Sequence, residues 1–186
     1  MGSSNLSLAR TAAQVVTVLR ARGETVATAE SLTGGLLGAT ITGVPGASVV
    51  YRGGLIPYNT ELKATLVGVS PAILAEDGPV AASTAAQLAE GAARVCGANW
   101  GLATTGVAGP DSQDGHPVGQ VFIAVARCLV GELTEVRELR LTEVRELRLT
   151  EVRELSLMGD REAIRTQTVA AVLALLLESL TSLRAS

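Results

Sequence analysis

Segments with the periodicity of strands and of helices alternate along this chain. Apolar residues recur at helical spacing over 6–22, and a run of alternating, partly β-branched residues follows over 24–30. Because parallel strands need crossover connections, this order predicts the α/β class: a three-layer α/β/α sandwich with a mostly parallel, mixed sheet, in a single domain spanning 1–186. Further strand-like runs lie at 47–58, 100–109 and 118–127, and further helical patterns at 31–42, 60–66, 71–76 and 83–95.

The expected core is aliphatic. Only four of the 186 residues are Phe, Trp or Tyr, although 47% are hydrophobic, so Ala, Val, Leu and Ile must fill the interior. This composition favours close packing of helices on a sheet. The most apolar run, 168–180, reaches Glu178 too soon to cross a bilayer, so we expect a buried C-terminal helix and no membrane partner.

Charge and cysteine usage exclude several classes of function. The formal net charge is −3, which argues against nucleic acid as a partner because phosphate binding needs clustered Lys and Arg. Cys96 and Cys128 form no CxxC pair and His116 is the only histidine, so no metal site is expected. Since no secretory leader is recognised, we expect both cysteines to be buried, reduced thiols of a cytoplasmic protein.

Three near-identical octapeptides fill residues 133–156, reading LTEVRELR, LTEVRELR and LTEVRELS. Wound as a helix, their apolar residues would scatter around the whole circumference. As a strand, each copy places Leu, Glu, Arg and Leu on one face and Thr, Val, Glu and Arg or Ser on the other. One copy therefore predicts a strand, whereas three in line would extend roughly 80 Å, too long for this domain. The remaining copies must protrude, fold back, loop out or pair with another chain, and we assign the insert no catalytic chemistry.

Three hydroxyl-bearing residues lie where strand-like runs end or pass into a turn. Because ligands of α/β sheets bind beyond the carboxyl ends of the strands, Ser31, Tyr58 and Thr105 could converge on one crevice. Ser31 lies between a strand-like run and a helical pattern. This position alone favours a helix cap, although nucleophilic serines are also found between a strand and a helix. A Ser-His-Asp triad is not supported, since His116 lies in a distant polar loop. Lys63, the only lysine, could activate a hydroxyl if desolvated, but its residue type alone favours a solvated charge.

Two glycine-rich turns could bind an anion through backbone amides. Gly34 and Gly35 open the helical pattern of 31–42, and a second turn covers 105–110. Neither matches a Walker A loop or a complete GxGxxG sequence, so the turns alone indicate ordinary strand-to-helix connections.

Four segments together resemble a known family. AESLTGGLLGATIT, VPGASVVYRGGLIPYNTELKATLVGV, TTGVAGPDSQDGHPVGQVFIAVA and MGDREAIRTQTVAAVLALLL, in this order, are similar to the C-terminal domain of the CinA proteins, the nicotinamide-nucleotide amidohydrolase (PncC) family. The resemblance implies a metal-independent and cofactor-free α/β/α enzyme that deamidates nicotinamide mononucleotide to nicotinic acid mononucleotide and ammonia.

The resemblance also implies roles for individual residues. Ser31 corresponds to the proposed nucleophile, while Tyr58 and Lys63 correspond to residues proposed to activate it and to shuttle protons. The oxyanion would be stabilised by amides of Thr33 to Gly35 or of the Gly106 loop. For the 5′-phosphate, the glycine-rich turns and the two arginines of GDREAIR are candidates. The expected substrate-binding residues are Thr33, Gly34, Gly35, Ser48, Gly53, Asn59, Thr105, Gly106, Gly109, Arg161 and Arg165.

Two departures and two alternatives accompany this prediction. The chain has VAAS at 80–83 where the family shows a Val-Ser-Glu-like sequence, and HPVG at 116–119 where the family shows Lys-Pro-Val-Gly. A catalytically impaired nucleotide-binding module and an oligomerisation module of the same fold are the alternatives to the amidohydrolase. The partners expected for the amidohydrolase are the nucleotide substrate and further copies of the chain in a homo-oligomer.

Overall fold

A computed structural model describes residues 3–128 and 149–182, in which five strands form one mixed sheet. Along the sheet the order is β2-β1-β3-β4-β5; β2, β1 and β3 are parallel, and β4 is antiparallel to both β3 and β5. The mixed sheet is therefore confirmed, with the parallel pairing confined to three strands. The strands are β1 (Val26–Glu30), β2 (Tyr51–Leu55), β3 (Trp100–Gly106), β4 (Gln120–Arg127) and β5 (Leu149–Ser156).

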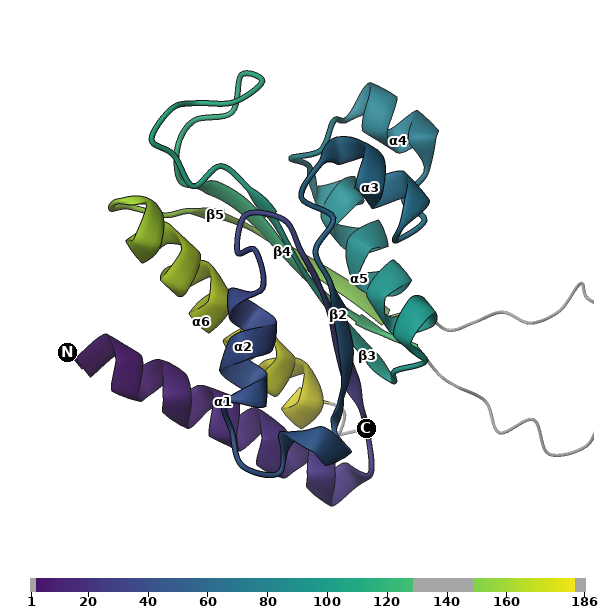
Figure 1. The fold of residues 1–186 in the computed structure, drawn as a ribbon, viewed down its shortest axis with the longest axis vertical. Coiled ribbons are helices and arrows are strands. Elements are labelled where there is room, and N and C mark those ends of the chain that lie inside the picture. The colour runs from purple at the N-terminus through teal and green to yellow at the C-terminus, as the bar shows by residue number, and fades with distance from the viewer. Residues whose placement is uncertain (1–2, 129–148, 183–186) are drawn as a thin grey trace, which may run out of the picture.

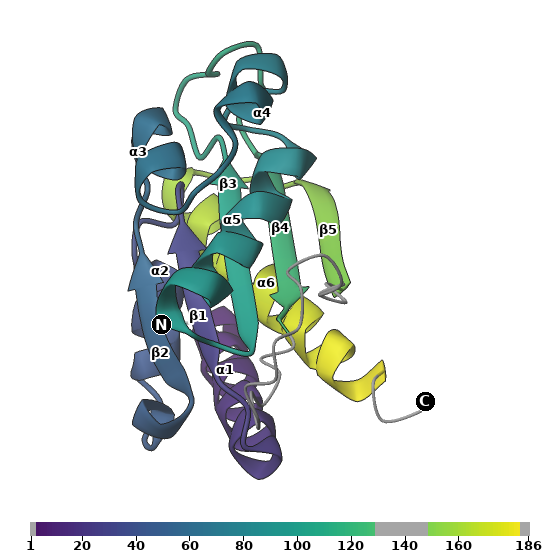
Figure 2. The same cartoon turned by 90° about the vertical axis from the view of Figure 1, so that its right-hand side faces the viewer.

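Helices cover both faces of the sheet, which confirms the three layers (Figure 1). On one face lie α1 (Ser3–Arg22), α2 (Leu36–Thr42) and α6 (Arg161–Ser182). The long helix α5 (Ala82–Cys96) covers the other face, while α3 (Thr60–Thr65) and α4 (Pro71–Glu76) lie near the end of the sheet where the parallel strands finish (Figure 2). A short 3₁₀ helix, η1 (Ala47–Val49), precedes β2 at the opposite end.

Aliphatic side chains fill the core on both faces, as the composition predicts. The cluster on the α1 and α6 face contains Leu and Val from the helices packed on the sheet, whereas the α5 face is rich in Ala. Small residues let α5 approach closely: a Cβ on Gly101 of β3 would lie 1.9 Å from the carbonyl oxygen of Ala89 in α5. The backbone of α5 therefore rests directly on the sheet.

Some helix starts differ from the sequence prediction. The helix expected over 31–42 begins only at Leu36, because Gly34 and Gly35 adopt left-handed φ angles of 57° and 97° and form a turn. Ser31 is therefore not a helix cap, and its predicted capping role is wrong. Ser83, the first residue of the helical pattern expected over 83–95, lies inside α5 and donates its hydroxyl to Asp77.

The third octapeptide forms β5 at the edge of the sheet, and its two faces are those that the alternation predicts. Val152 packs on the α5 side and Leu155 on the α6 side. Arg153 extends toward α6, where it forms an ion pair with Glu178. The first two copies, 133–148, lie outside the described residues, so the alternatives considered for them stay predictions.

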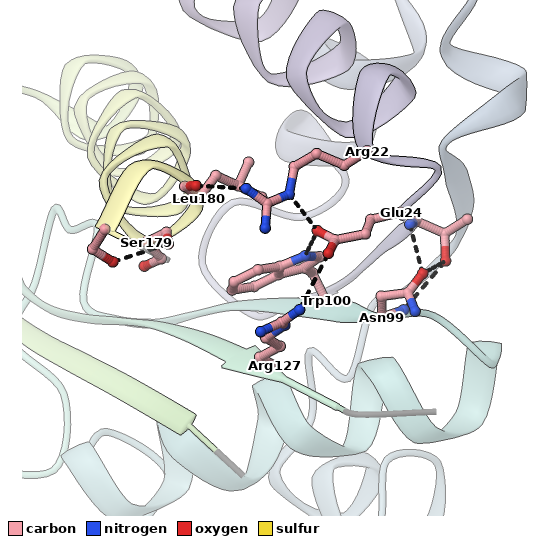
Figure 3. Close-up of polar contacts among 9 residues, drawn as sticks. Arg22, Glu24, Asn99, Trp100, Arg127, Ser179 and Leu180 are labelled. Carbon is pink, nitrogen blue, oxygen red and sulfur yellow. Dashed lines mark hydrogen bonds and ion pairs between the residues drawn. The ribbon is translucent and has the colours of Figure 1, made fainter. Parts of the chain in front are cut away.

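A cluster of polar contacts around Glu24 joins several elements at the amino ends of the parallel strands (Figure 3). The carboxylate of Glu24 accepts hydrogen bonds from Arg22 Nε at 3.1 Å, Trp100 Nε1 at 2.8 Å and Arg127 at 3.3 Å. Arg22 also donates to the carbonyl of Leu180 at 2.8 Å, which joins the end of α1 to the end of α6. One carboxylate thus connects α1, β3 and β4 at the end of the sheet remote from Ser31.

Helix α6 is a core helix. Among the described residues it is the one helix whose length and composition would suffice to cross a membrane, yet half of its most apolar window is buried inside the domain. Ile164, Leu173 and Leu176 are fully buried and belong to the core cluster on that face. The predicted buried C-terminal helix is confirmed. Cys96 and Cys128 are half-buried rather than buried, contrary to expectation, because Cys96 is the last residue of α5 and Cys128 directly follows β4.

We predict that deleting 133–148 preserves the fold. The deletion keeps one octapeptide to form β5 and leaves 128–132 as the connection between two antiparallel neighbours, a length typical of hairpins. A shorter connection loses less conformational entropy when its ends are brought together on folding. The free energy of unfolding of the variant should therefore be larger by about 1 kcal/mol. Urea unfolding would measure this change. A variant that loses its cooperative transition would contradict the assignment of one copy to one strand.

Candidate active site

A pocket of about 150 Å³ opens at the carboxyl ends of β1 and β3, beneath α3 and the loop after β3. The elements explain its position, because Ser31 directly follows β1, Gly106 ends β3, and parallel neighbours finish at the same edge of the sheet. Ser31, Tyr58 and Thr105 all line it, so the three residues do converge. The lining residues are Ser31, Leu32, Tyr58, Thr60, Lys63, Pro79, Val80, Thr105, Gly106, Val107, Ala108, Gly109, Asp111, Gln113 and Arg161.

Ser31 and Lys63 are in direct contact in this pocket. The Nζ atom of Lys63 lies 3.1 Å from Oγ of Ser31 and 3.0 Å from the carbonyl oxygen of Pro57. The backbone of Ser31 is fixed by a hydrogen bond from its amide to the carbonyl of Thr104 at 2.9 Å, which extends the pairing of β1 with β3. A serine hydroxyl next to an amine is an arrangement that can activate a nucleophile.

Lys63 is buried, with only 1% of its surface exposed. The solvated charge favoured by its residue type alone is therefore wrong: α3 folds back over the pocket and carries the side chain inward. Burial lowers the pKa of Lys63 from 10.5 to about 8, because the charged ammonium loses its hydration. A substantial fraction of the amine is consequently neutral near pH 8.

Arg161 joins three distant segments at the rim of the pocket. From the first turn of α6 it donates to the hydroxyl of Tyr58 at 3.0 Å and to the carbonyl of Gly109 at 2.7 Å. Tyr58 itself is 58% exposed and lines the pocket from the segment before α3. The guanidinium thereby sets the position of the tyrosine relative to the loop after β3.

The loop after β3 is shaped by close backbone packing. The hydroxyl of Thr105 donates to the carbonyl of Pro79 at 2.6 Å and so ties the end of β3 to the connection before α5. Gly106 has a φ of 153°, and a Cβ there would lie 2.5 Å from the carbonyl oxygen of Gln120. Only glycine fits between β3 and β4 at this point.

Three predicted substrate-binding residues lie behind the pocket instead of lining it. Thr33 is fully buried, and its hydroxyl donates to the carboxylate of Glu30 at 2.8 Å. The amide of Gly35 also donates to Glu30, at 3.0 Å, and Gly34 lies beside Arg165. The turn 33–35 therefore directs donors to a carboxylate of the protein itself and is not part of the pocket lining, and its contact with the substrate stays a prediction.

Four further predicted residues are not part of the pocket lining. Ser48 belongs to η1, at the amino ends of the parallel strands, and Gly53 lies within β2 facing Cys96. Asn59 caps α3, its side chain accepting a hydrogen bond from the amide of Glu61, and Arg165 donates to the carbonyl of Thr33 at 2.6 Å. These four residues are predicted because they lie in segments that resemble the family. The resemblance of a segment does not indicate which end or face of the sheet each of its residues occupies.

Sequence reasoning also missed several lining residues. Asp111 and Gln113 follow the TGVAGP turn directly, so extending the candidate segment by three positions would have found them. Pro79 and Val80 come from the connection between α4 and α5, for which the sequence contains no comparable signal. Within 3–128 and 149–182, no group of three His, Cys, Asp or Glu side chains is placed to hold a metal ion.

Comparisons with known sequences support one family. The family described as the CinA C-terminal domain matches residues 8–180. A CinA-like protein of Frankia casuarinae is 42% identical over 169 residues, covering 91% of this chain and 35% of that protein. A CinA-like protein of Solibacter usitatus is 40% identical over 165 residues, covering 88% and 35%. The chain thus spans about a third of the length of these relatives.

Solved structures agree with the sequence comparisons. The competence/damage inducible protein CihA from Agrobacterium tumefaciens is 30% identical with a TM-score of 0.79, over 94% of this chain and 96% of that one. The competence damage-inducible protein A (ComA) from Klebsiella pneumoniae is 28% identical with a TM-score of 0.80, over 94% and 97%. The match across nearly the whole domain shows that this chain belongs to the CinA C-terminal domain family.

Proposed function

We propose that this domain hydrolyses the carboxamide of nicotinamide mononucleotide, giving nicotinic acid mononucleotide and ammonia. The observation that carries the proposal is the 3.1 Å contact between the hydroxyl of Ser31 and the amine of buried Lys63, at the wall of a pocket. The choice of substrate rests on the resemblance of the four sequence segments to the nicotinamide-nucleotide amidohydrolases.

In the first step, neutral Lys63 accepts the proton of Ser31 as the hydroxyl oxygen attacks the carboxamide carbon. A pKa of about 8 makes the unprotonated amine available near neutral pH. The tetrahedral intermediate then collapses as the carbon–nitrogen bond breaks, and the Lys63 ammonium returns its proton to the departing nitrogen. Ammonia leaves, and an ester links the substrate to Ser31.

Water completes the reaction in the second step. Lys63, neutral again, removes a proton from a water molecule that attacks the ester carbon. The bond to Ser31 breaks, and the proton on Lys63 passes back to the serine oxygen. One carboxamide and one water are thus converted to one carboxylic acid and one ammonia, without any redox change.

The oxyanion formed in each step needs hydrogen-bond donors. Of the two loops considered from the sequence, the turn before α2 directs the amide of Gly35 to Glu30. The Gly106 loop lines the pocket and is therefore the better candidate.

We assign the 5′-phosphate to Arg161. Its guanidinium has five N–H donors, and its contacts with Gly109 and Tyr58 use two of them. The remaining donors can bind phosphate oxygens at the rim while the carboxamide lies deeper, near Ser31.

We also propose that the reaction takes place in the cytoplasm, where the thiol of Cys96 would stay reduced.

Replacing Ser31 should abolish the activity. Ser31→Ala removes the nucleophile, so ammonia release from nicotinamide mononucleotide should fall by at least about 10³-fold. Ser48→Ala, at the opposite end of the sheet, is the matched control and should retain full activity. Ammonia production equal to that of the unaltered protein by Ser31→Ala would exclude the serine mechanism.

Lys63 should titrate near pH 8 and control the rate. Because the chain has one lysine, a sample with ¹³C-labelled lysine gives one side-chain signal whose pH dependence reports this group directly. The reaction rate should rise through the same midpoint, and Lys63→Arg, which stays charged, should be inactive. A midpoint near the ordinary value of 10.5 would refute the proposed base.

The same titration predicts how stability depends on pH. The folded state releases the proton of Lys63 near pH 8, whereas the unfolded chain retains it to about pH 10.5. Between these values the unfolded state binds more protons, so the contribution of Lys63 to stability rises with pH. Urea unfolding should show this rise as a difference between the unaltered protein and Lys63→Met, and a flat difference would contradict it.

Arg161→Gln should weaken phosphate recognition selectively. Loss of a charge-assisted contact should raise KM for nicotinamide mononucleotide by about tenfold to a hundredfold. The nucleoside, which lacks the phosphate, should be hardly affected. Steady-state kinetics with both substrates distinguishes this role from a structural one, for which both KM values would change together.

A further inference from the structure

We propose that Glu30 is a positioning residue, whose buried carboxylate holds the end of β1 so that Ser31 faces Lys63. The inference rests on the proposed role of Ser31 as a nucleophile. Glu30 does not line the pocket and is 2% exposed, so it is not a group that touches the substrate.

Four donors surround this carboxylate. Oε2 accepts hydrogen bonds from the hydroxyl of Thr33 at 2.8 Å, the amide of Leu37 at 2.9 Å and the amide of Gly35 at 3.0 Å. Oε1 accepts one from the amide of Gly38 at 2.8 Å. All four donors belong to the turn before α2 or to its first residues, so a single side chain fixes this whole segment against β1.

The environment of the Glu30 carboxylate consists of hydrogen-bond donors. No cation contacts Glu30 in the described part of the chain, so the amides and the hydroxyl must offset the loss of hydration. The Thr33 hydroxyl gives its only proton to Glu30, so its 2.8 Å contact with Thr104 requires Thr104 to be the donor. A Cβ on Gly38 would lie 3.4 Å from Oε1 and 2.6 Å from the hydroxyl of Tyr51, so glycine makes room there.

Strand geometry transmits this constraint to Ser31. Successive side chains in an extended segment point to opposite faces, so Glu30 faces α2 while Ser31 faces Lys63 on the other side. The amide of Ser31 also bonds to Thr104, whose side chain belongs to the same buried network as Glu30. Rotation of the strand end would break these hydrogen bonds and move Oγ away from Nζ.

The test uses Glu30→Gln, which keeps the shape and removes the charge. A glutamine can retain the three bonds to Oε2, but its NH₂ group would face the amide proton of Gly38. Thr28→Val is the matched control, because it removes a buried hydroxyl on the same face of β1 that bonds to Tyr51 at 2.9 Å. Urea unfolding of each variant gives its free energy of unfolding, and hence the fraction of folded protein under the assay conditions.

The readout is covalent labelling of Ser31 by a fluorophosphonate. The serine oxygen displaces fluoride from phosphorus and its proton passes to Lys63, so the labelling rate measures the contact without nicotinamide mononucleotide. Folded Glu30→Gln should label about tenfold to a hundredfold more slowly than the unaltered protein and should lose the dependence on the Lys63 titration near pH 8. Thr28→Val should label at the unaltered rate and with the same midpoint.

Kinetics with nicotinamide mononucleotide provides a second readout. Glu30→Gln should lower kcat and leave KM unchanged, since Glu30 is not part of the pocket. If Glu30→Gln does not fold, Thr33→Val serves instead, because it removes one donor and keeps the charge, and it should label several-fold more slowly.

Labelling of the folded variants at the unaltered rate would overturn the proposal, as would an equal loss in Thr28→Val. Failure of the unaltered protein to label at Ser31 would overturn it too. A protein that labels at Ser31 but releases no ammonia would instead refute the proposed substrate, and the comparison of variants would still decide the role of Glu30.

Discussion

The contact between Lys63 and Ser31 depends on burying the amine of a lysine side chain, which is only 1% exposed. Two segments accomplish this: β1 ends at the floor of the pocket, and α3 folds back over it with Lys63 on its inner side. Loss of hydration weakens the charged form of the amine, which is the same change that makes it a proton acceptor. The depressed pKa of Lys63 and the proposed chemistry are therefore both consequences of the burial that the position of α3 brings about.

The two ends of the sheet use carboxylates for a similar purpose. Glu24 collects donors from α1, β3 and β4 at the amino ends, and Glu30 collects donors from the start of α2 at the carboxyl ends. Between them they hold β1 at both ends, while its centre is covered by aliphatic residues on either face. The short strand β1, which lies between β2 and β3, can thus present Ser31 in a fixed orientation although the residues after it form an irregular turn.

The sequence predicts well those features that depend on period and order. Alternating segments indicate the three layers, and the even length of the octapeptide indicates both faces of β5. Contacts between distant segments are not encoded in this way: burial of Lys63 requires α3 to fold over the pocket, and the late start of α2 requires Glu30 to capture its amides. Ser48 and Gly53 illustrate the same limit, since a familiar segment does not state which end or face of a sheet its residues occupy.

Lys63 is the only lysine among 15 basic Lys and Arg residues, so every other cationic side chain is a guanidinium. Reactive acyl donors that modify amines therefore find, apart from the amino terminus, one target in the whole chain. That target is 1% exposed and lines the candidate pocket, so an acyl donor reaches it only by entering that pocket. Acylation of this protein would accordingly report access to the candidate pocket, and each modified molecule would have lost its proposed base.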